Sequence, residues 1–306
     1  MLPTYNRSNV LDKSLSAITC SVSENVCILV IDNDSSDDTL EIVQKYQRVD
    51  DRIKYIKNRI NVGPSRTLYL GFLNVDTEFF IIRGDRDEPT PYFFEEVIKI
   101  CELNSTVGVF HAAYLCDKHK YPKEMSKMIA RSGIIKSGFN AMEFMFNASG
   151  MIHGLAFRTS CVKNEYWILD ANLYPQTLIA GMVGLYFDAY YYISESHYLF
   201  VPPGTGSLVA IKNDQKRPND WGILERLEIA KRLINENNKK DTGKNIQDII
   251  PPLMQFAALT FRKMCQEEFN MADKFLKSIL ADECVVESEI FWNTVLNYLS
   301  CEKDQK

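Results

Sequence analysis

The chain has 306 residues, of which 46% are hydrophobic and 25% charged, and its net charge is −5. This composition is typical of a globular protein, either one large domain or a domain with a helical appendage. The acidic balance and the lack of a strong basic run argue against a nucleic-acid-binding protein.

The eight cysteines are widely scattered and form no CxxC pair. This pattern favours reduced thiols over a disulfide framework. The most apolar segment, residues 177–187, has only about half the length that a bilayer-spanning helix requires. We therefore expect a protein that is soluble or only peripherally bound to a membrane.

Residues 1–115 alternate short apolar runs with amphipathic stretches. The unbroken apolar run at residues 26–31 predicts a parallel strand that is covered on both faces. Further strands are expected at 53–56, 79–82 and 107–114, and helices at 9–19, 36–46, 65–73 and 92–103. This order predicts an α/β fold, with a mostly parallel sheet and helices on both faces.

The rest of the chain divides into two further parts, residues 116–215 and 216–306. The first is less regular, and its tyrosines at 190–192 are expected to alternate between core and surface along a strand. The second predicts three helices: one with its apolar stripe at residues 223–234, one starting near Pro251 or Pro252, and one over 287–299.

Three polar segments follow predicted strands, at residues 32–39, 61–66 and 84–88, and a fourth, residues 2–7, begins the chain and leads into the first helix. The carboxyl ends of parallel strands share one edge of the sheet, so these four segments should converge on one crevice. Open α/β sheets bind their ligands at such an edge.

Each segment offers a chemical group to this crevice. Asp85 and Asp87 are candidate metal ligands, because carboxylate oxygens suit Mg or Mn ions that bridge to phosphate. Tyr5 offers a face for stacking on a base, and Asp32 can hydrogen-bond a base or ribose. Each residue alone also fits a turn, cap or packing role. The four segments together favour a metal-dependent site for a phosphorylated ligand.

In this order, the four segments resemble the nucleotide-binding half of family 2 glycosyltransferases with the GT-A fold. The family's Pro-x-Tyr-Asn opening, Asp-rich turn, Asn-x-Gly loop and DXD motif correspond to residues 3–6, 32–39, 61–63 and 85–87. The resemblance covers residues 1 to about 115 and is strongest to the bacterial branch that builds O-antigen (lipopolysaccharide) and capsular polysaccharides.

The resemblance assigns roles to residues of this chain. Asp87 would hold the metal on the diphosphate, and Asp32 and Asp85 would contact the base or ribose. From the residues alone, His153 is a candidate for the acceptor pocket, with a histidine satisfied by backbone contacts as the alternative. The nucleotide-binding residues would be Pro3, Thr4, Tyr5, Arg7, Asp32, Asn33, Asn61, Gly63, Arg66 and Asp85. Asn33 carries both a donor and an acceptor, so it leaves the choice between uracil, thymine and cytosine open.

The implied reaction moves a sugar from a nucleotide diphosphate donor to a hydroxyl of a glycan or lipid-linked acceptor, with inversion. Mn or Mg would act as Lewis acid for the departing diphosphate and a carboxylate as general base. Residues 1–115 would be the nucleotide-sugar-binding half, 116–215 the acceptor-binding half and 216–306 a C-terminal helical segment. Such an enzyme is expected in the cytoplasm, at the inner face of the cell membrane.

The chain departs from the family pattern in three places. The family has an apolar strand before residues 3–6 that is almost absent here, so an added apolar N-terminal extension should raise the melting temperature. Arg86 places a cation between Asp85 and Asp87. The general base is expected at Asp170, with Glu165 and Asp188 as alternatives, because Pro-Gln stands at residues 175–176 where an acidic pair is common.

Two alternatives to this transferase remain open. One is a binding protein of the same fold that has lost turnover, which Arg86 and the absent acidic pair suggest. The other is a nucleotidyltransferase, which is disfavoured because residues 3–7 contain no glycine. The helical segment is expected to pack on the sheet domain, with homodimer formation or contact with a lipid-linked acceptor as alternatives.

Overall fold

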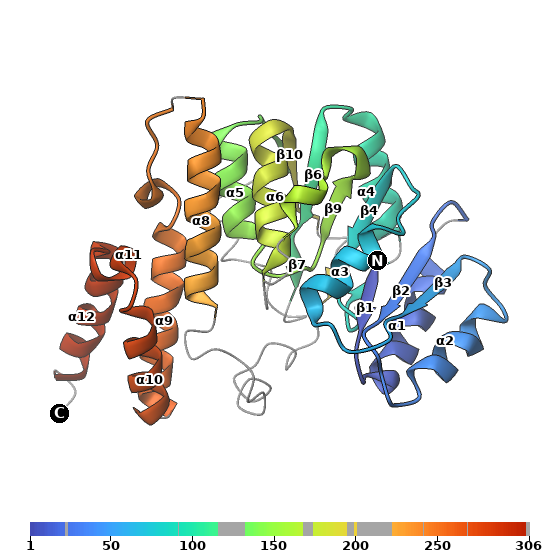
Figure 1. Cartoon of the computed structure of the whole chain (residues 1–306), viewed down its shortest axis with the longest axis horizontal. Helices are drawn as coiled ribbons and strands as arrows, with labels where there is room; N and C mark the ends of the chain where they lie inside the picture. Colours follow the sequence, from blue (N-terminus) through green and yellow to red (C-terminus); the bar gives the residue numbers. More distant parts are fainter. Residues whose placement is uncertain are drawn as a thin grey trace. The chain divides into compact units, whose positions relative to one another are not determined.

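The computed structural model describes residues 1–21, 24–90, 92–115, 132–167, 174–194, 199–200, 222–240, 242–267 and 269–303 (Figure 1). The chain divides into two compact units, Met1–Ala210 and Ile211–Lys306. Within the described residues, no helix is both long and apolar enough to cross a membrane.

The first unit opens with alternating strands and helices, blue in Figure 1. These are β1 (Leu2–Thr4), α1 (Ser8–Ser21), β2 (Ile28–Asp32), α2 (Thr39–Gln47), β3 (Ile53–Lys57), α3 (Pro64–Phe72) and β4 (Phe79–Ile82). The first three strands are parallel, with Val30 opposite both Leu2 and Tyr55. The predicted βαβα order is therefore confirmed, with ends that shift by one to a few residues.

A second set of strands has the order β4-β9-β6-β10-β8. The new strands are β6 (Val107–Ala112), β8 (Gly133–Ile135), β9 (Leu155–Arg158) and β10 (Asp188–Tyr192). β9 is antiparallel to both of its neighbours, so β4 and β6 still run in the same direction. Met1 joins the two sets, because its amino group donates to the Ile81 carbonyl at 2.8 Å and its carbonyl accepts from the Arg83 amide at 3.2 Å.

The helices α4 (Phe93–Leu103), α5 (Phe139–Ala148) and α6 (Pro175–Tyr186) complete this α/β layer. A small sheet combines β5 (Glu88–Pro89), β7 (Tyr114–Leu115) and β11 (Leu199–Phe200). The predicted alternation of the tyrosines is wrong: Tyr191 and Tyr192 are both buried. The strand lies inside the sheet between β6 and β8, where both of its faces are covered.

One hydrophobic core lies where α1, α2 and α4 meet the strands. Leu11 and Leu15 of α1 pack there with Val30 of β2, Val43 of α2 and Phe93 of α4. The apolar residues of α1 recur at helical spacing, which places them on a single face of the helix. This packing holds the ends of β1, β2 and β4 in place, and the polar loops follow those ends.

The second unit is helical. It contains α8 (Ile223–Asn238), α9 (Pro251–Glu267), α10 (Phe269–Ile279), α11 (Glu283–Val286) and α12 (Glu289–Lys303), and α9 packs against α10 and α12. The prediction of three helices is therefore wrong for the described residues, since α10 and α11 were missed. In α10, the buried residues Ala272, Phe275 and Ile279 recur at helical spacing, so the sequence carries an amphipathic pattern there that the prediction overlooked.

Candidate active site

The structure brings the loops after β1, β2 and β4 together at one edge of the sheet. The Thr4 hydroxyl of β1 donates to Asp85 at 3.2 Å, and the Thr4 carbonyl accepts from the Asn33 amide at 3.0 Å. The Asn33 side chain in turn donates to Asn61, which follows β3, at 2.9 Å. All four predicted segments thus share one edge, as expected for a parallel sheet.

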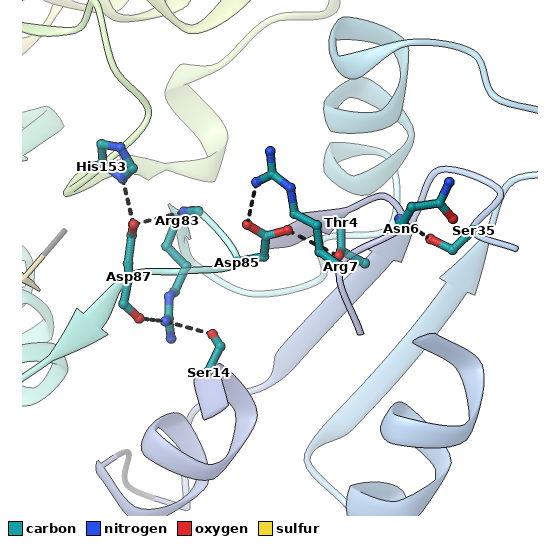
Figure 2. Close-up of polar contacts among 10 residues, drawn as sticks. Thr4, Asn6, Arg7, Ser14, Ser35, Arg83, Asp85, Asp87 and His153 are labelled. Carbon is teal, nitrogen blue, oxygen red and sulfur yellow. Dashed lines mark hydrogen bonds and ion pairs between the residues drawn. The ribbon is translucent and has the colours of Figure 1, made fainter. Parts of the chain in front are cut away.

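Asp85 is almost fully buried and has two partners. Arg7 Nη1 donates to Asp85 Oδ1 at 3.0 Å, and Thr4 Oγ1 occupies the other oxygen (Figure 2). Arg86 makes no ion pair with Asp85 or Glu88 among the described residues. Arg86 thus does not pair with Asp85, whose partners are Arg7 and Thr4 at the start of the chain.

Asp87 is fully buried beside His153. His153 Nδ1 lies 2.7 Å from Asp87 Oδ1 and 2.8 Å from Oδ2, and the Gly84 amide donates to Oδ2 at 2.9 Å. A Cβ atom on Gly84 would lie 3.0 Å from Asp87 Oδ1 and 3.2 Å from His153 Cε1, so glycine leaves room for this pair. The structure thus places His153 against a predicted metal ligand, and its acceptor role stays a prediction.

Arg83 was not among the residues predicted from the sequence. Its guanidinium is buried and donates through Nη2 to Ser14 Oγ of α1 at 2.9 Å and to the carbonyl of Asp87. Burial lowers the pKa of Arg83 to about 10, and the nearby Asp87 and Asp85 oppose that shift. The side chain therefore remains cationic at neutral pH.

Asp32 is fully buried at the end of β2. Its Oδ1 accepts from the Ser35 amide at 2.8 Å and its Oδ2 accepts from the Tyr55 hydroxyl at 2.6 Å. Burial and this bond to Asp32 raise the pKa of Tyr55. Asp32 thus holds its own turn and joins β2 to β3, and contact with a base or ribose stays a prediction.

Asn33 links β2 to the loop after β3. Its oxygen accepts from the Val62 amide at 2.9 Å and from Asn58 Nδ2 at 3.1 Å. Asn61 accepts from Asn33 and also from the Gly63 amide at 3.0 Å. Gly63 has φ +82°, a left-handed conformation that favours glycine at the start of α3. The side chain predicted to read the base therefore shapes the loop.

The first loop exposes side chains toward solvent. Tyr5 is 44% exposed, so its ring is accessible for stacking, and Arg7 and Arg66 are also exposed. Pro3 is half-buried. Asn6, to which the prediction gave no role, ties this loop to the turn after β2. Its amide donates to Ser35 Oγ at 2.9 Å (Figure 2), and its side-chain oxygen accepts from the Ser36 amide at 2.8 Å.

The predicted general base, Asp170, lies outside the described residues. Of the two alternatives, Glu165 is exposed, whereas Asp188 begins β10 at the opposite edge of the sheet from Asp87. Asp188 accepts from Thr106 at 2.7 Å and from Lys136 at 2.9 Å. Burial raises its pKa, but these hydrogen bonds outweigh burial and leave the pKa below its usual value. Asp188 therefore ties strands together away from the site.

Gln176 stands in the first turn of α6, where an acidic residue was expected. It is buried, and its Nε2 lies 3.3 Å from the carbonyl of Ser149 and 3.4 Å from that of Gly150. An amide can donate to both carbonyls and a carboxylate cannot, so this position serves to join α6 to the end of α5.

No three His, Cys, Asp or Glu side chains in the described ranges are grouped to hold a metal ion by themselves. Asp87 and His153 nevertheless offer a carboxylate and an imidazole within 2.7 Å of each other. Mg²⁺-type sites commonly use one or two carboxylates and take their other ligands from substrate phosphates. The donor set therefore fits a divalent cation that arrives together with a diphosphate.

Comparison with known families identifies the chain. A model of the family described as "Glycosyl transferase family 2" matches residues 1–161, more than half of the chain. The chain belongs to this family. It is 28% identical over 246 residues to the GalNAc(5)-diNAcBac-PP-undecaprenol beta-1,3-glucosyltransferase of Campylobacter jejuni, a match that covers 77% of this chain and 74% of that relative.

Solved structures agree on the fold. Residues 1–349 of S. aureus TarS in complex with UDP-GlcNAc match with a TM-score of 0.59 and 13% identity, over 98% of this chain and 90% of that one. The match to a longer TarS structure spans only 42% of its length. PcManGT from Pyrobaculum calidifontis, a mannosyltransferase in complex with GDP-Man and Mn²⁺, matches with a TM-score of 0.55 and 15% identity, over 97% and 83% of the two chains. The predicted GT-A fold and the prediction of a glycosyltransferase enzyme are confirmed.

Proposed function

We propose that this family 2 glycosyltransferase moves a sugar from a nucleoside diphosphate to a hydroxyl of a glycan or lipid-linked oligosaccharide, with inversion, and that a divalent cation binds at Asp87. The observation that carries this proposal is the buried pair Asp85 and Asp87 at the carboxyl edge of β4, where loops from four strands meet.

Two structural neighbours support the choice of donor and cation. TarS 1–349 binds UDP-GlcNAc in its crystal structure, and PcManGT binds GDP-Man and Mn²⁺. By analogy, Tyr5 and the loop shaped by Asn33 would receive the base, and the exposed Arg7 and Arg66 would meet the phosphates. The base itself differs between these two neighbours, so the donor is proposed only as a nucleoside diphosphate sugar.

The residues around Asp87 orient its carboxylate. The Gly84 amide and His153 Nδ1 bond to its oxygens and fix its orientation, and Arg7 bonds to the neighbouring Asp85. A Mn²⁺ or Mg²⁺ ion held by Asp87 would supply Lewis acidity to the departing diphosphate. A carboxylate of the acceptor side, for which Asp170 stays the proposed residue, would take the proton of the attacking hydroxyl.

The Campylobacter relative, whose name specifies an undecaprenol-linked substrate, supports the proposed acceptor. We extend this to a lipid-linked oligosaccharide acceptor in bacterial polysaccharide synthesis, with the enzyme at the cytoplasmic face of the membrane. The three-part division of the chain at residues 115 and 215, and a homodimer, belong to the same proposal.

Thermal unfolding with nucleotides tests the donor and the cation. UDP, dTDP, CDP and GDP are each added with and without Mn²⁺ to the wild type, to Asp87→Ala, and to Asp76→Ala as a control. Asp76 is an exposed carboxylate that pairs with Lys54 at the surface. A ligand at 100 times its dissociation constant stabilises the folded state by about 2.7 kcal/mol, which is readily measured.

The expected result is a shift with one nucleotide that requires Mn²⁺, disappears in Asp87→Ala and persists in Asp76→Ala. A shift that needs neither Mn²⁺ nor Asp87 would contradict the cation site. No shift with any nucleotide would contradict the donor class. Release of free nucleotide from the matching nucleotide sugar, on addition of a lipid-linked acceptor fraction, would exclude the alternative of a binding protein without turnover.

A further inference from the structure

The buried Arg83 lies directly beneath the turn that carries Asp87. It is only 3% exposed, and its backbone amide donates to the carbonyl of Met1 at 3.2 Å. Figure 2 shows its guanidinium between two acceptors, the hydroxyl of Ser14 on α1 and the backbone carbonyl of Asp87. Arg83 thus connects a packed helix to the residue that the proposed function assigns to the cation.

The turn itself is closed by contacts between its ends. The Asp87 amide donates to the Gly84 carbonyl at 3.2 Å, and the Gly84 amide donates back to Asp87 Oδ2 at 2.9 Å. His153 bonds the carboxylate from the other side. Asp87 is therefore held at its carboxylate by Gly84 and His153, and at its backbone by Arg83.

We propose that Arg83, anchored on Ser14, is a positioning residue that sets the Asp87 carboxylate for the divalent cation of the donor. This inference rests on the proposed function, which places the cation at Asp87. Arg83 does not touch the cation or the donor. It acts by fixing the backbone from which the Asp87 side chain extends.

The energetics of Arg83 support a role beyond packing. A buried charge is costly unless it is well paired, and apolar side chains of similar volume often replace such a group without loss of stability. Among the described residues, Nε and Nη1 of Arg83 have no hydrogen-bond partner. The single nitrogen Nη2 makes both side-chain bonds. The guanidinium thus has few hydrogen bonds for a buried charge, but the bonds that it makes connect α1 to the backbone of Asp87.

The informative substitutions keep the positive charge. A substitution that removes the positive charge of Arg83 would itself strengthen metal binding at the neighbouring carboxylates, because it removes a repulsion between like charges. That gain would obscure a loss of positioning. Arg83→Lys keeps the charge but replaces a planar fork with a single ammonium that cannot reproduce its geometry. Ser14→Ala leaves Arg83 in place and removes only its anchor. Ser16→Ala, at an exposed position two residues further along α1, is the matched control.

The measurement is the Mn²⁺ concentration that gives half-maximal binding of the nucleotide that stabilises the wild type in the thermal screen. It is made by calorimetry on the full chain, below the unfolding temperature of every variant. Nucleotide affinity at saturating Mn²⁺ is measured alongside. Partners that orient a metal ligand typically change metal affinity about 10- to 100-fold. We expect the half-maximal Mn²⁺ concentration to rise about tenfold in Arg83→Lys and a few-fold in Ser14→Ala, and to stay unchanged in Ser16→Ala.

The role of Arg83 predicts that nucleotide affinity at saturating Mn²⁺ stays constant while the Mn²⁺ requirement rises, so that excess Mn²⁺ restores binding. Loss of stability without a change in the Mn²⁺ requirement would show that Arg83 is only structural. Asp87→Ala separates the two hypotheses. If it binds Mn²⁺ like the wild type, the cation site itself is wrong. If Arg83→Lys and Ser14→Ala bind Mn²⁺ like the wild type but Asp87→Ala does not, the positioning role is wrong and the cation site stands.

Discussion

Two buried polar clusters of the first unit differ in how well their hydrogen bonds are satisfied. In the loop cluster, every side-chain nitrogen and oxygen of Asp32 and Asn33 has at least one partner. In the cluster at the end of α5, Oε1 of Gln176 has no partner among the described residues, and the buried ring of His111 has at most the carbonyl of Ala148. Buried polar atoms without partners cost about 1–3 kcal/mol each.

The difference shows how the fold divides its roles. The bonds of the loop cluster hold the loops after β2 and β3 in one arrangement before a ligand binds. Such preorganisation reduces the entropy that binding must overcome. The cluster at the end of α5 holds the strand β6 to α5 and α6, and there a change of charge has few partners to compensate it. Replacing an amide by a carboxylate in each cluster tests this contrast directly.

Gln176→Glu should cause the largest effect. The carboxylate would face the carbonyls of Ser149 and Gly150 in a site that is 2% exposed, without the two N–H donors of the amide. An uncompensated buried charge destabilises by about 3–5 kcal/mol. Denaturant unfolding at pH 7 measures this loss. Burial would raise the pKa of the new carboxyl above its unfolded value, so the loss should shrink as the pH falls toward 5.

A matched apolar variant, Gln176→Met, keeps the volume without the charge and should lose less stability than Gln176→Glu. Equal losses in the two variants at pH 7 would show that the donated hydrogen bonds, rather than the buried charge, account for the effect.

His111→Leu should change how stability depends on pH. Burial lowers the pKa of His111 to about 4, against a usual 6.5, while the carbonyl of Ala148 opposes the shift and His153 adds to it. The unfolded chain therefore binds more protons between pH 6.5 and 4, and stability falls as the pH falls through this window. The lowered pKa of His111 therefore reduces the unfolding free energy at pH 4 by about 3 kcal/mol relative to neutral pH.

In the Leu variant this part of the pH dependence should be absent, so its unfolding free energy should approach or exceed that of the wild type at pH 4. Urea titrations at pH 7, 5.5 and 4 measure both curves. Parallel curves would mean that His111 takes up a proton as easily in the folded chain as in the unfolded one.

Asn33→Asp, the counterpart of Gln176→Glu in the loop cluster, should have a smaller effect. The carboxylate keeps the bonds donated by the Val62 amide and Asn58, and loses only the one that Asn33 donates to the exposed Asn61. We expect a loss of about 1 kcal/mol in unfolding free energy. A loss as large as that of Gln176→Glu would contradict the contrast between the two clusters.

The features predicted correctly from the sequence depend on local patterns. Apolar runs and helical spacing within residues 1–115 gave the βαβα order, and that order placed Asp32, Asn61 and Asp85 at one edge. The missed features depend on partners far along the chain. Arg83 reaches Ser14, 69 residues away, and His153 reaches Asp87, 66 residues away. The spacing of apolar residues along a short segment carries no information about contacts so far apart in the chain. For the same reason it did not predict that the antiparallel strand β9 lies between β4 and β6.

A third region, at the amino ends of β1, β2 and β4, has a packing defect instead of a hydrogen-bonding one. A cavity of about 370 Å³ lies there, and its lining includes Cys27, Ile28, Phe79, Ile81 and Val97. Leu2 pairs with Val30, so β1 begins beside the middle of β2. Residues placed before Met1 could therefore extend β1 between β2 and β4 and bury apolar side chains in the cavity.

Adding Val-Ile-Val before Met1 should stabilise the protein by about 1 kcal/mol, in the range of other cavity-filling changes. For a chain of this size, that corresponds to a rise of roughly 2–4 °C in melting temperature. Differential scanning calorimetry measures the shift, with Gly-Ser-Gly as the control extension, which adds length without apolar area. An equal rise with both extensions would mean that moving the buried terminal amino group, and not filling the cavity, stabilises the sheet. No rise with Val-Ile-Val would show that the sheet tolerates the cavity.

With either extension, nucleotide binding at the opposite edge of the sheet should not change, because the loop cluster is held by its own hydrogen bonds.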